Sequence, residues 1–76
     1  AIALWINNPI IEGLQATAMN TDLLPSERTK GTDALREVGY PAIPALNTIA
    51  NYTPLLPSER EKATMFIQQI LKEQKS

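Results

Sequence analysis

The sequence contains no cysteine and no histidine. These absences exclude disulfide bonds, thiol nucleophiles, imidazole acid–base catalysis and zinc sites with the usual ligands. Seven basic and eight acidic residues are interspersed along the chain and give a net charge of −1. No basic stripe or polybasic patch is therefore available for phosphates or anionic lipids. We expect no catalytic residues, no metal, no cofactor and no nucleic-acid partner.

Long apolar runs are also missing. The longest, from Ala1 to Ile6, falls far short of the roughly 20 residues of a membrane span and lacks the basic flank of a signal peptide. We expect no membrane span, with the cytoplasm as the default compartment. Because the chain begins with Ala rather than Met, we expect a processed form or a piece of a longer protein.

The most informative feature that is present is an internal repeat. The hexapeptide Leu-Leu-Pro-Ser-Glu-Arg occurs at Leu23 to Arg28 and again at Leu55 to Arg60, an offset of 32 residues. A fixed period of this length is typical of stacked supersecondary units, each of which buries its apolar face against its neighbours. We treat the chain as one small domain with four parts: the end of a partial repeat (1–8), two repeat units (9–40 and 41–72) and a tail (73–76).

Each unit predicts two helices joined by a tight turn. In the centre, helix A is expected at about Ser26 to Val38 and is stopped by a left-handed Gly39, and helix B is expected at about Pro41 to Tyr52. The apolar positions predicted to face inward are Gly31, Ala34, Leu35 and Val38 on helix A, and Ala42, Ala45, Leu46, Ile49 and Ala50 on helix B. The short connection makes each repeat one helical hairpin.

The same register assigns the two ends of the chain. Asn8 and Pro9 should open an earlier helix B, which follows the last turns of a preceding helix A. A capping box of Ser58 and Glu61 should open a final helix that runs to about Gln74. The inward residues are Ile2, Ala3, Ile6, Ile10, Ile11, Leu14 and Ala18 at the start, and Ala63, Phe66, Ile67, Ile70 and Leu71 at the end. We predict an all-α fold, a short stack of antiparallel helical hairpins with about four helices.

Arg28 and Arg60 recur in the first turn of a helix, where a positive charge opposes the helix dipole. We expect each stem to pack along the seam between repeats while its guanidinium reaches a carboxylate or a loop carbonyl, which braces the seam. Ligand contact is the alternative. Ser26 and Ser58 are interpreted as helix caps rather than nucleophiles. The remaining expectations are exposed pairs of Glu27 with Lys30 and of Glu59 with Lys62. Trp5 and Tyr40 are expected to pack in the core or the seam, with a binding hot spot as the alternative.

The outward side of the B helices is the candidate partner-binding surface. It is polar but nearly uncharged, which suits hydrogen bonding to a peptide or protein surface and does not suit phosphate. An idle solvated face is the alternative. The candidate partner-binding residues are Glu12, Gln15, Met19, Pro44, Asn47, Thr48 and Asn51.

The central unit resembles the HEAT-like repeat in its spacing of an arginine, an Ala-Leu pair, a hydrophobic residue with glycine, and a Pro-Ala segment. The residues that carry the resemblance are Arg28, Ala34, Leu35, Val38, Gly39, Pro41, Ala42, Ile43, Pro44, Ala45 and Leu46. The resemblance implies an α-solenoid fragment used as a protein-interaction scaffold. We therefore expect a non-catalytic protein–protein interaction module from a larger assembly. The alternatives are an enzyme accessory or HEAT-like lyase fragment, and a self-associating structural subunit that hides Ile2, Leu4, Trp5 and Ile6 against a symmetry mate.

Overall fold

A computed structural model describes residues 8–74, and all regular structure in this range is helical. Four α-helices and one short 3-10 helix follow one another: α2 (Pro9–Met19), α3 (Pro25–Val38), η1 (Tyr40–Ala42), α4 (Ile43–Ala50) and α5 (Pro57–Gln74). The predicted all-α class is confirmed. The expectations for Ile2, Ala3, Leu4, Trp5 and Ile6 lie outside the described residues.

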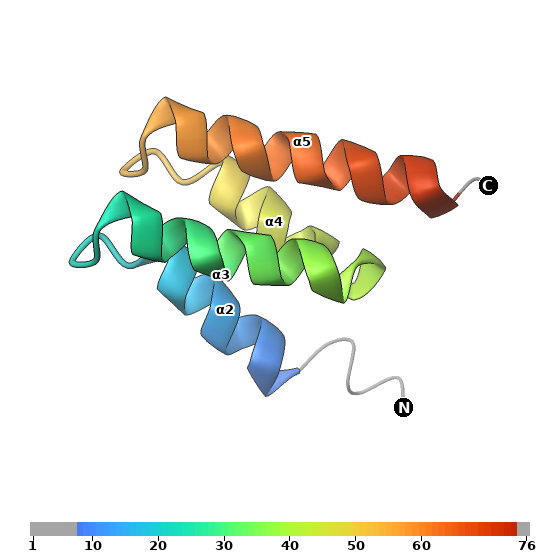
Figure 1. The fold of residues 1–76 in the computed structure, drawn as a ribbon, viewed down its shortest axis with the longest axis horizontal. Helices are drawn as coiled ribbons and strands as arrows, with labels where there is room; N and C mark the ends of the chain where they lie inside the picture. The colour runs from blue at the N-terminus through green and yellow to red at the C-terminus, as the bar shows by residue number, and fades with distance from the viewer. Residues whose placement is uncertain (1–7, 75–76) are drawn as a thin grey trace.

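The half of the chain before Gly39 packs against the half after it. Helices α3 and α5 lie side by side and run in the same direction (Figure 1), and α2 contacts both α3 and α4. Helix α4 in turn packs on α5. We call the contact of α3 with α5 and of α2 with α4 the internal joint, because it holds the two sequence repeats together.

Proline sets the start of three helices. Pro9, Pro25 and Pro57 each occupy the first helical position, where the missing N–H group costs nothing. Asn8 Oδ1 caps α2 by accepting hydrogen bonds from the backbone N–H groups of residues 10 and 11, at 2.9 and 3.4 Å. The prediction of a cap at Asn8 and a helix opened by Pro9 agrees with this geometry.

The predicted capping box of Ser58 and Glu61 is wrong. Pro57 begins α5 two residues earlier than the capping box requires, so the third helical position belongs to Glu59 and not to Glu61. The Glu59 carboxylate accepts a hydrogen bond from the backbone N–H of Leu56 at 3.3 Å. The first repeat does the same with Glu27 and the N–H of residue 24, also at 3.3 Å. In both repeats the glutamate of the hexapeptide, and not the serine, accepts the hydrogen bond from the backbone N–H at the start of the helix.

The second helix B is shorter than the predicted span from Pro41 to Tyr52. The chain first forms the 3-10 turn η1, in which the N–H of Ile43 donates to the carbonyl of Tyr40. Pro44 has no N–H group with which to close the next α-helical bond, so α4 is established only from Ile43 onward. Gly39 has the positive φ expected of it, 89°, but its ψ of −141° is not that of a left-handed helical residue.

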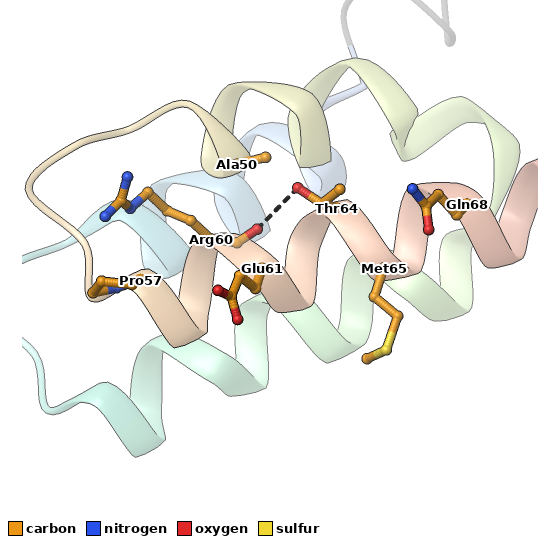
Figure 2. A pocket seen from close by; sticks show the side chains of 7 residues that line it. All are labelled: Ala50, Pro57, Arg60, Glu61, Thr64, Met65 and Gln68. Atoms are coloured by element: carbon orange, nitrogen blue, oxygen red, sulfur yellow. Dashed lines mark hydrogen bonds between the residues drawn. The ribbon is translucent and has the colours of Figure 1, made fainter.

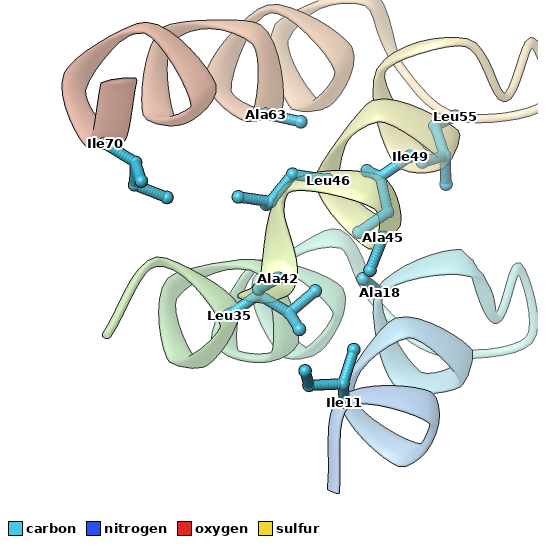
Figure 3. Close-up of a cluster of buried hydrophobic side chains, with 10 residues drawn as sticks. All are labelled: Ile11, Ala18, Leu35, Ala42, Ala45, Leu46, Ile49, Leu55, Ala63 and Ile70. Carbon is cyan, nitrogen blue, oxygen red and sulfur yellow. The ribbon is translucent and has the colours of Figure 1, made fainter. Parts of the chain in front are cut away.

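The core collects aliphatic side chains from all four α-helices (Figure 3). Leu35, Leu46, Ile49 and Ile70 are the largest side chains that are fully buried. Three residues expected to face inward are instead exposed: Ile10 by 67%, Val38 by 37% and Leu71 by 43%. Each lies in an end turn of its helix, where no described helix covers it. An apolar residue in an end turn is therefore buried only where another element packs on it, as happens for Ile11 and Ala18 in α2.

Helix α3 approaches the backbone of α2 closely at Gly31. A Cβ atom at this position would lie 2.7 Å from the backbone oxygen of Leu14 and 3.1 Å from the backbone nitrogen of Ala18. Both are backbone atoms of α2, which cannot move aside as the end of a side chain can. Gly13 in α2 is the contrasting case, because a Cβ atom there meets nothing within 4 Å.

We predict opposite effects for alanine at these two glycines. Gly31→Ala should lower the free energy of unfolding by about 1–3 kcal/mol, because α2 and α3 must separate to admit the methyl group. Gly13→Ala should raise it by roughly 0.5–1 kcal/mol, because alanine is the better helix former and has open space. Urea unfolding followed by circular dichroism measures both. Equal effects of the two substitutions would contradict the close approach at Gly31.

Candidate interaction surface

Helices α2 and α4 border an open groove on the outside of the molecule. Its volume is about 200 Å³, and we call it the outer groove. The residues that line it are Asn8, Ile11, Glu12, Gln15, Pro41, Pro44, Ala45 and Thr48. Four of the seven residues proposed from the sequence as partner-binding are among them: Glu12, Gln15, Pro44 and Thr48. The structure thus brings residues from both repeats to one place.

The other three proposed residues lie outside the lining of the groove. Asn47 and Asn51 are exposed on α4 and at its end, where the Asn51 side-chain amide donates to the carbonyl of Asn47 at 2.8 Å. Met19 is half-buried and packs against the core. Its sulfur accepts a hydrogen bond from the side-chain amide of Gln15 at 3.6 Å, which ties the Gln15 side chain along α2.

The chemistry of the outer groove is that of a hydrogen-bonding surface. Glu12 supplies a carboxylate and Gln15 an amide, while no lysine or arginine is part of the lining. The Thr48 hydroxyl already donates to the carbonyl of Pro44 at 3.1 Å, so it remains an acceptor for an incoming donor. Such a surface accepts backbone or side-chain N–H groups and offers nothing to bind phosphate.

A second structural site lies at the internal joint. Arg28 in α3 and Glu59 in α5 form a two-bond ion pair in which Nε donates to Oε2 and Nη2 to Oε1, both at 2.8 Å. The third guanidinium nitrogen, Nη1, donates to the carbonyl oxygen of Leu23 at 2.6 Å. The two side chains are only 8% and 9% exposed. The planar fork of an arginine matches a carboxylate in this geometry.

The ion pair shifts the titration of both groups. The hydrogen bonds from Arg28 hold the pKa of the Glu59 carboxyl below its ordinary value of 4.5, against the opposing effect of burial. The same hydrogen bonds raise the pKa of the Arg28 guanidinium. Both shifts favour the charged forms, so the pair is ionised at neutral pH.

Sequence reasoning missed Glu59. It was expected to pair with Lys62 on an exposed face, and this is wrong, because Glu59 is buried against Arg28 while Lys62 Nζ bonds to Asp33 at 2.8 Å. The signal that could have found the pair is the position of Glu immediately before Arg in both copies of the hexapeptide. Stacking one copy on the other brings the glutamate of the second beside the arginine of the first.

Arg60 occupies the position of Arg28 in the second repeat, but its surroundings differ. It borders a larger open pocket of about 380 Å³, which we call the α5 pocket (Figure 2). The pocket is lined by Ala50, Pro57, Arg60, Glu61, Thr64, Met65 and Gln68. The Nε of Arg60 is buried and has no hydrogen-bond partner among residues 8–74. Arg28 in α3 and Arg60 in α5 thus occupy corresponding positions. Within residues 8–74, the Nε of Arg28 donates to a carboxylate and the Nε of Arg60 does not.

The other expectations for chemically active residues concern exposed positions. Ser26 and Ser58 are exposed within the first turns of α3 and α5 rather than at the cap positions. Tyr40 is 45% exposed and is therefore not a core residue, while packing at the seam stays a prediction for it. Within residues 8–74 no three acidic side chains gather in a way that could hold a metal ion, and no helix has the length and apolar character to cross a membrane.

Comparison with known proteins identified no relative, so a proposed function rests on the geometry of the surfaces described above. Neither the family models, the curated proteins nor the solved structures gave a match to this chain.

We predict that the Arg28–Glu59 pair makes stability depend on acid. The unfolded chain holds the Glu59 proton more tightly than the folded chain does, so the pair stabilises the fold above the ordinary carboxyl pKa of 4.5. This contribution is lost as the pH falls from there through the lowered pKa. Glu59→Gln should reduce the free energy of unfolding at pH 7 by about 1.5–3 kcal/mol and should weaken its dependence on pH below 4.5.

The matched control is Glu27→Gln, the same change at the equivalent position of the first repeat. Glu27 is exposed, and glutamine retains an oxygen that can accept from the N–H of Leu24. We expect its stability to change by less than about 0.5 kcal/mol. Chemical unfolding of both variants between pH 3 and 7 provides the measurement. If the two variants lose the same stability, the buried pair does not have the role described.

Proposed function

We propose that this chain is a non-catalytic protein–protein interaction module, built from two HEAT-like helical repeats, that docks a partner protein in the outer groove. The observation that carries the proposal is the convergence of Glu12 and Gln15 from the first repeat with Pro44 and Thr48 from the second on one open groove. A groove formed between successive repeats is how helical-repeat proteins build extended binding surfaces.

The repeat architecture itself is supported by the equivalence of the two halves. Pro25 and Pro57 both begin an A helix, and Glu27 and Glu59 both cap it through the same backbone contact. Helix α2 packs on α3 as α4 packs on α5. Identical residues thus have the same local role in each half, as expected of stacked units related by a constant operation.

The size and chemistry of the outer groove favour a protein partner. Its volume of about 200 Å³ is below the roughly 300–1,000 Å³ of typical small-molecule pockets. The carboxylate of Glu12 and the amide of Gln15, spaced along α2, suit N–H donors on a peptide segment or on the surface of a folded protein. The partner is expected to present a short polar segment and to place one or two small side chains between α2 and α4.

We predict that a double substitution in the groove abolishes partner binding. In Gln15→Arg with Thr48→Arg, two long cationic side chains fill the groove, one from each repeat; Thr48 is exposed and Gln15 is half-buried. Immobilised wild-type chain should retain a stoichiometric partner from its native source, and the double variant should not. The retained protein is then purified, and its affinity for both chains is measured by calorimetry.

The matched control adds the same charge at equivalent sites away from the groove. Thr21 and Thr53 are exposed in the α2–α3 and α4–α5 loops and occupy the same position in the two repeats. Thr21→Arg with Thr53→Arg should leave the affinity of the purified partner unchanged. If both double variants bind as the wild type does, the partner docks elsewhere. If neither binds, added charge and not the groove explains the loss.

A further inference from the structure

We propose that the α5 pocket receives the α2–α3 side of a second copy of this chain, so that Arg60 of one copy pairs with Glu27 of the next. The surface involved is separate from the outer groove, and the inference does not depend on the partner proposed above. It rests on the internal joint, which shows how one repeat of this sequence packs against another.

The face that borders the α5 pocket corresponds to the face already used in the internal joint. Arg60, Thr64 and Gln68 follow one another along α5 (Figure 2), each 32 positions after Arg28, Thr32 and Arg36 of α3. In the internal joint Arg28 and Thr32 are buried, 7% and 4% exposed. Arg36 there bonds to two side chains of α5, Gln69 and Glu73. The α5 pocket is thus the same docking face, displaced by one repeat and uncovered.

Within residues 8–74, the α5 pocket and the α2–α3 side each carry one half of the kind of ion pair that the internal joint contains. At the α5 pocket, the buried Nε of Arg60 has no hydrogen-bond partner among the described residues. On the opposite side, Glu27 is exposed, and its carboxylate accepts a local hydrogen bond from the N–H of Leu24. Glu59 makes the equivalent local bond and still accepts both bonds of Arg28. Glu27 of a second copy is placed to do the same for Arg60.

Two further positions on the α2–α3 side fit a close neighbour. Gly13 is exposed in mid-helix with nothing within 4 Å of a Cβ atom, although glycine at such a position costs roughly 0.5–1 kcal/mol relative to alanine. Its counterpart in the second repeat, Ala45, is 4% exposed. Glu37, also exposed, corresponds to Gln69 and would meet Gln68, the counterpart of Arg36.

The two surfaces lie on different parts of the chain, so the contact is head-to-tail. Such a contact repeats from copy to copy and closes into a ring or continues as an open assembly, whereas a two-fold symmetric dimer uses the same patch twice. The pairing of Arg60 with Glu27 uses a different patch on each copy, so it requires the head-to-tail arrangement.

The test is sedimentation velocity of the full 76-residue chain over a range of concentrations at low salt. The wild type is expected to sediment faster as its concentration rises. Glu27→Arg and Arg60→Glu should each weaken self-association by about tenfold or more, because each leaves like charges facing across the contact. Asp22→Arg and Lys72→Glu are the controls, with the same charge changes at exposed positions elsewhere, and they should associate like the wild type.

The decisive measurement mixes the two charge-reversed variants. The arginine introduced at position 27 of one variant then faces the glutamate introduced at position 60 of the other, and the unaltered Glu27 and Arg60 also meet. The equimolar mixture should therefore recover the association that neither variant shows alone. Circular dichroism melting checks that each variant folds, and Arg60→Gln replaces Arg60→Glu if the latter does not. A wild type that stays monomeric at every concentration overturns the proposal, as does a Glu27→Arg variant that associates normally.

Discussion

The buried ion pair between Arg28 and Glu59 determines how the two halves of this molecule meet. Each carboxylate oxygen accepts one bond from the guanidinium, and the third guanidinium nitrogen is used by the Leu23 carbonyl. Burying two charges costs desolvation that the pairing offsets only when the geometry is good, so such a pair can add little net stability although removing one partner is costly. Sliding α5 along α3 by one turn would leave both charges buried without partners. The pair therefore selects one register for the packing of α5 on α3.

Aliphatic packing supplies the free energy that favours folding, while the ion pair selects the register in which the helices pack. Leu35, Leu46, Ile49 and Ile70 are fully buried, and they come from both halves of the chain. Burial of apolar area is non-directional, so these side chains would tolerate several relative positions of the helices. Within the first half of the chain, the close contact of Gly31 with the backbone of α2 restricts how α2 and α3 can pack. Between the two halves, the ion pair restricts how α3 and α5 can pack. Apolar burial and specific contacts thus have separate roles.

The all-α class and most helix boundaries were predictable, because the residues that start and stop helices act locally. Pro9, Gly39 and the repeated Leu-Leu-Pro mark helix ends by their own backbone chemistry, and the helices begin or end within a residue or so of those marks. The exposure of Ile10, Val38 and Leu71 could not be predicted, because an apolar residue in an end turn is covered only if another element packs on it. The late start and the early end of α4 were likewise missed. Pro44 was a local signal for the late start, because it has no N–H group to donate.

The outer groove was predictable in part, and Glu59 was not. Helical periodicity places Glu12 and Thr48 on outward faces, but only packing decides which outward residues border a depression between two helices. Glu59 was misjudged because the i,i+3 rule considers one helix at a time, and its true partner is 31 residues away. To predict a contact between two repeats, both the repeat period and the way the repeats pack must be known, and the sequence of one helix gives neither.

The separation of 31 residues, one less than the repeat period of 32, has a consequence for how such a chain can grow. The glutamate and the arginine that meet across a joint are adjacent residues of one hexapeptide, read from two successive units. Duplication of a single unit therefore supplies both halves of a new joint in one genetic event, with the acid of the added unit already in register with the base of the old one. A family of longer proteins built from this unit would need no compensating substitutions at its joints, and its length could change by whole units without loss of fit.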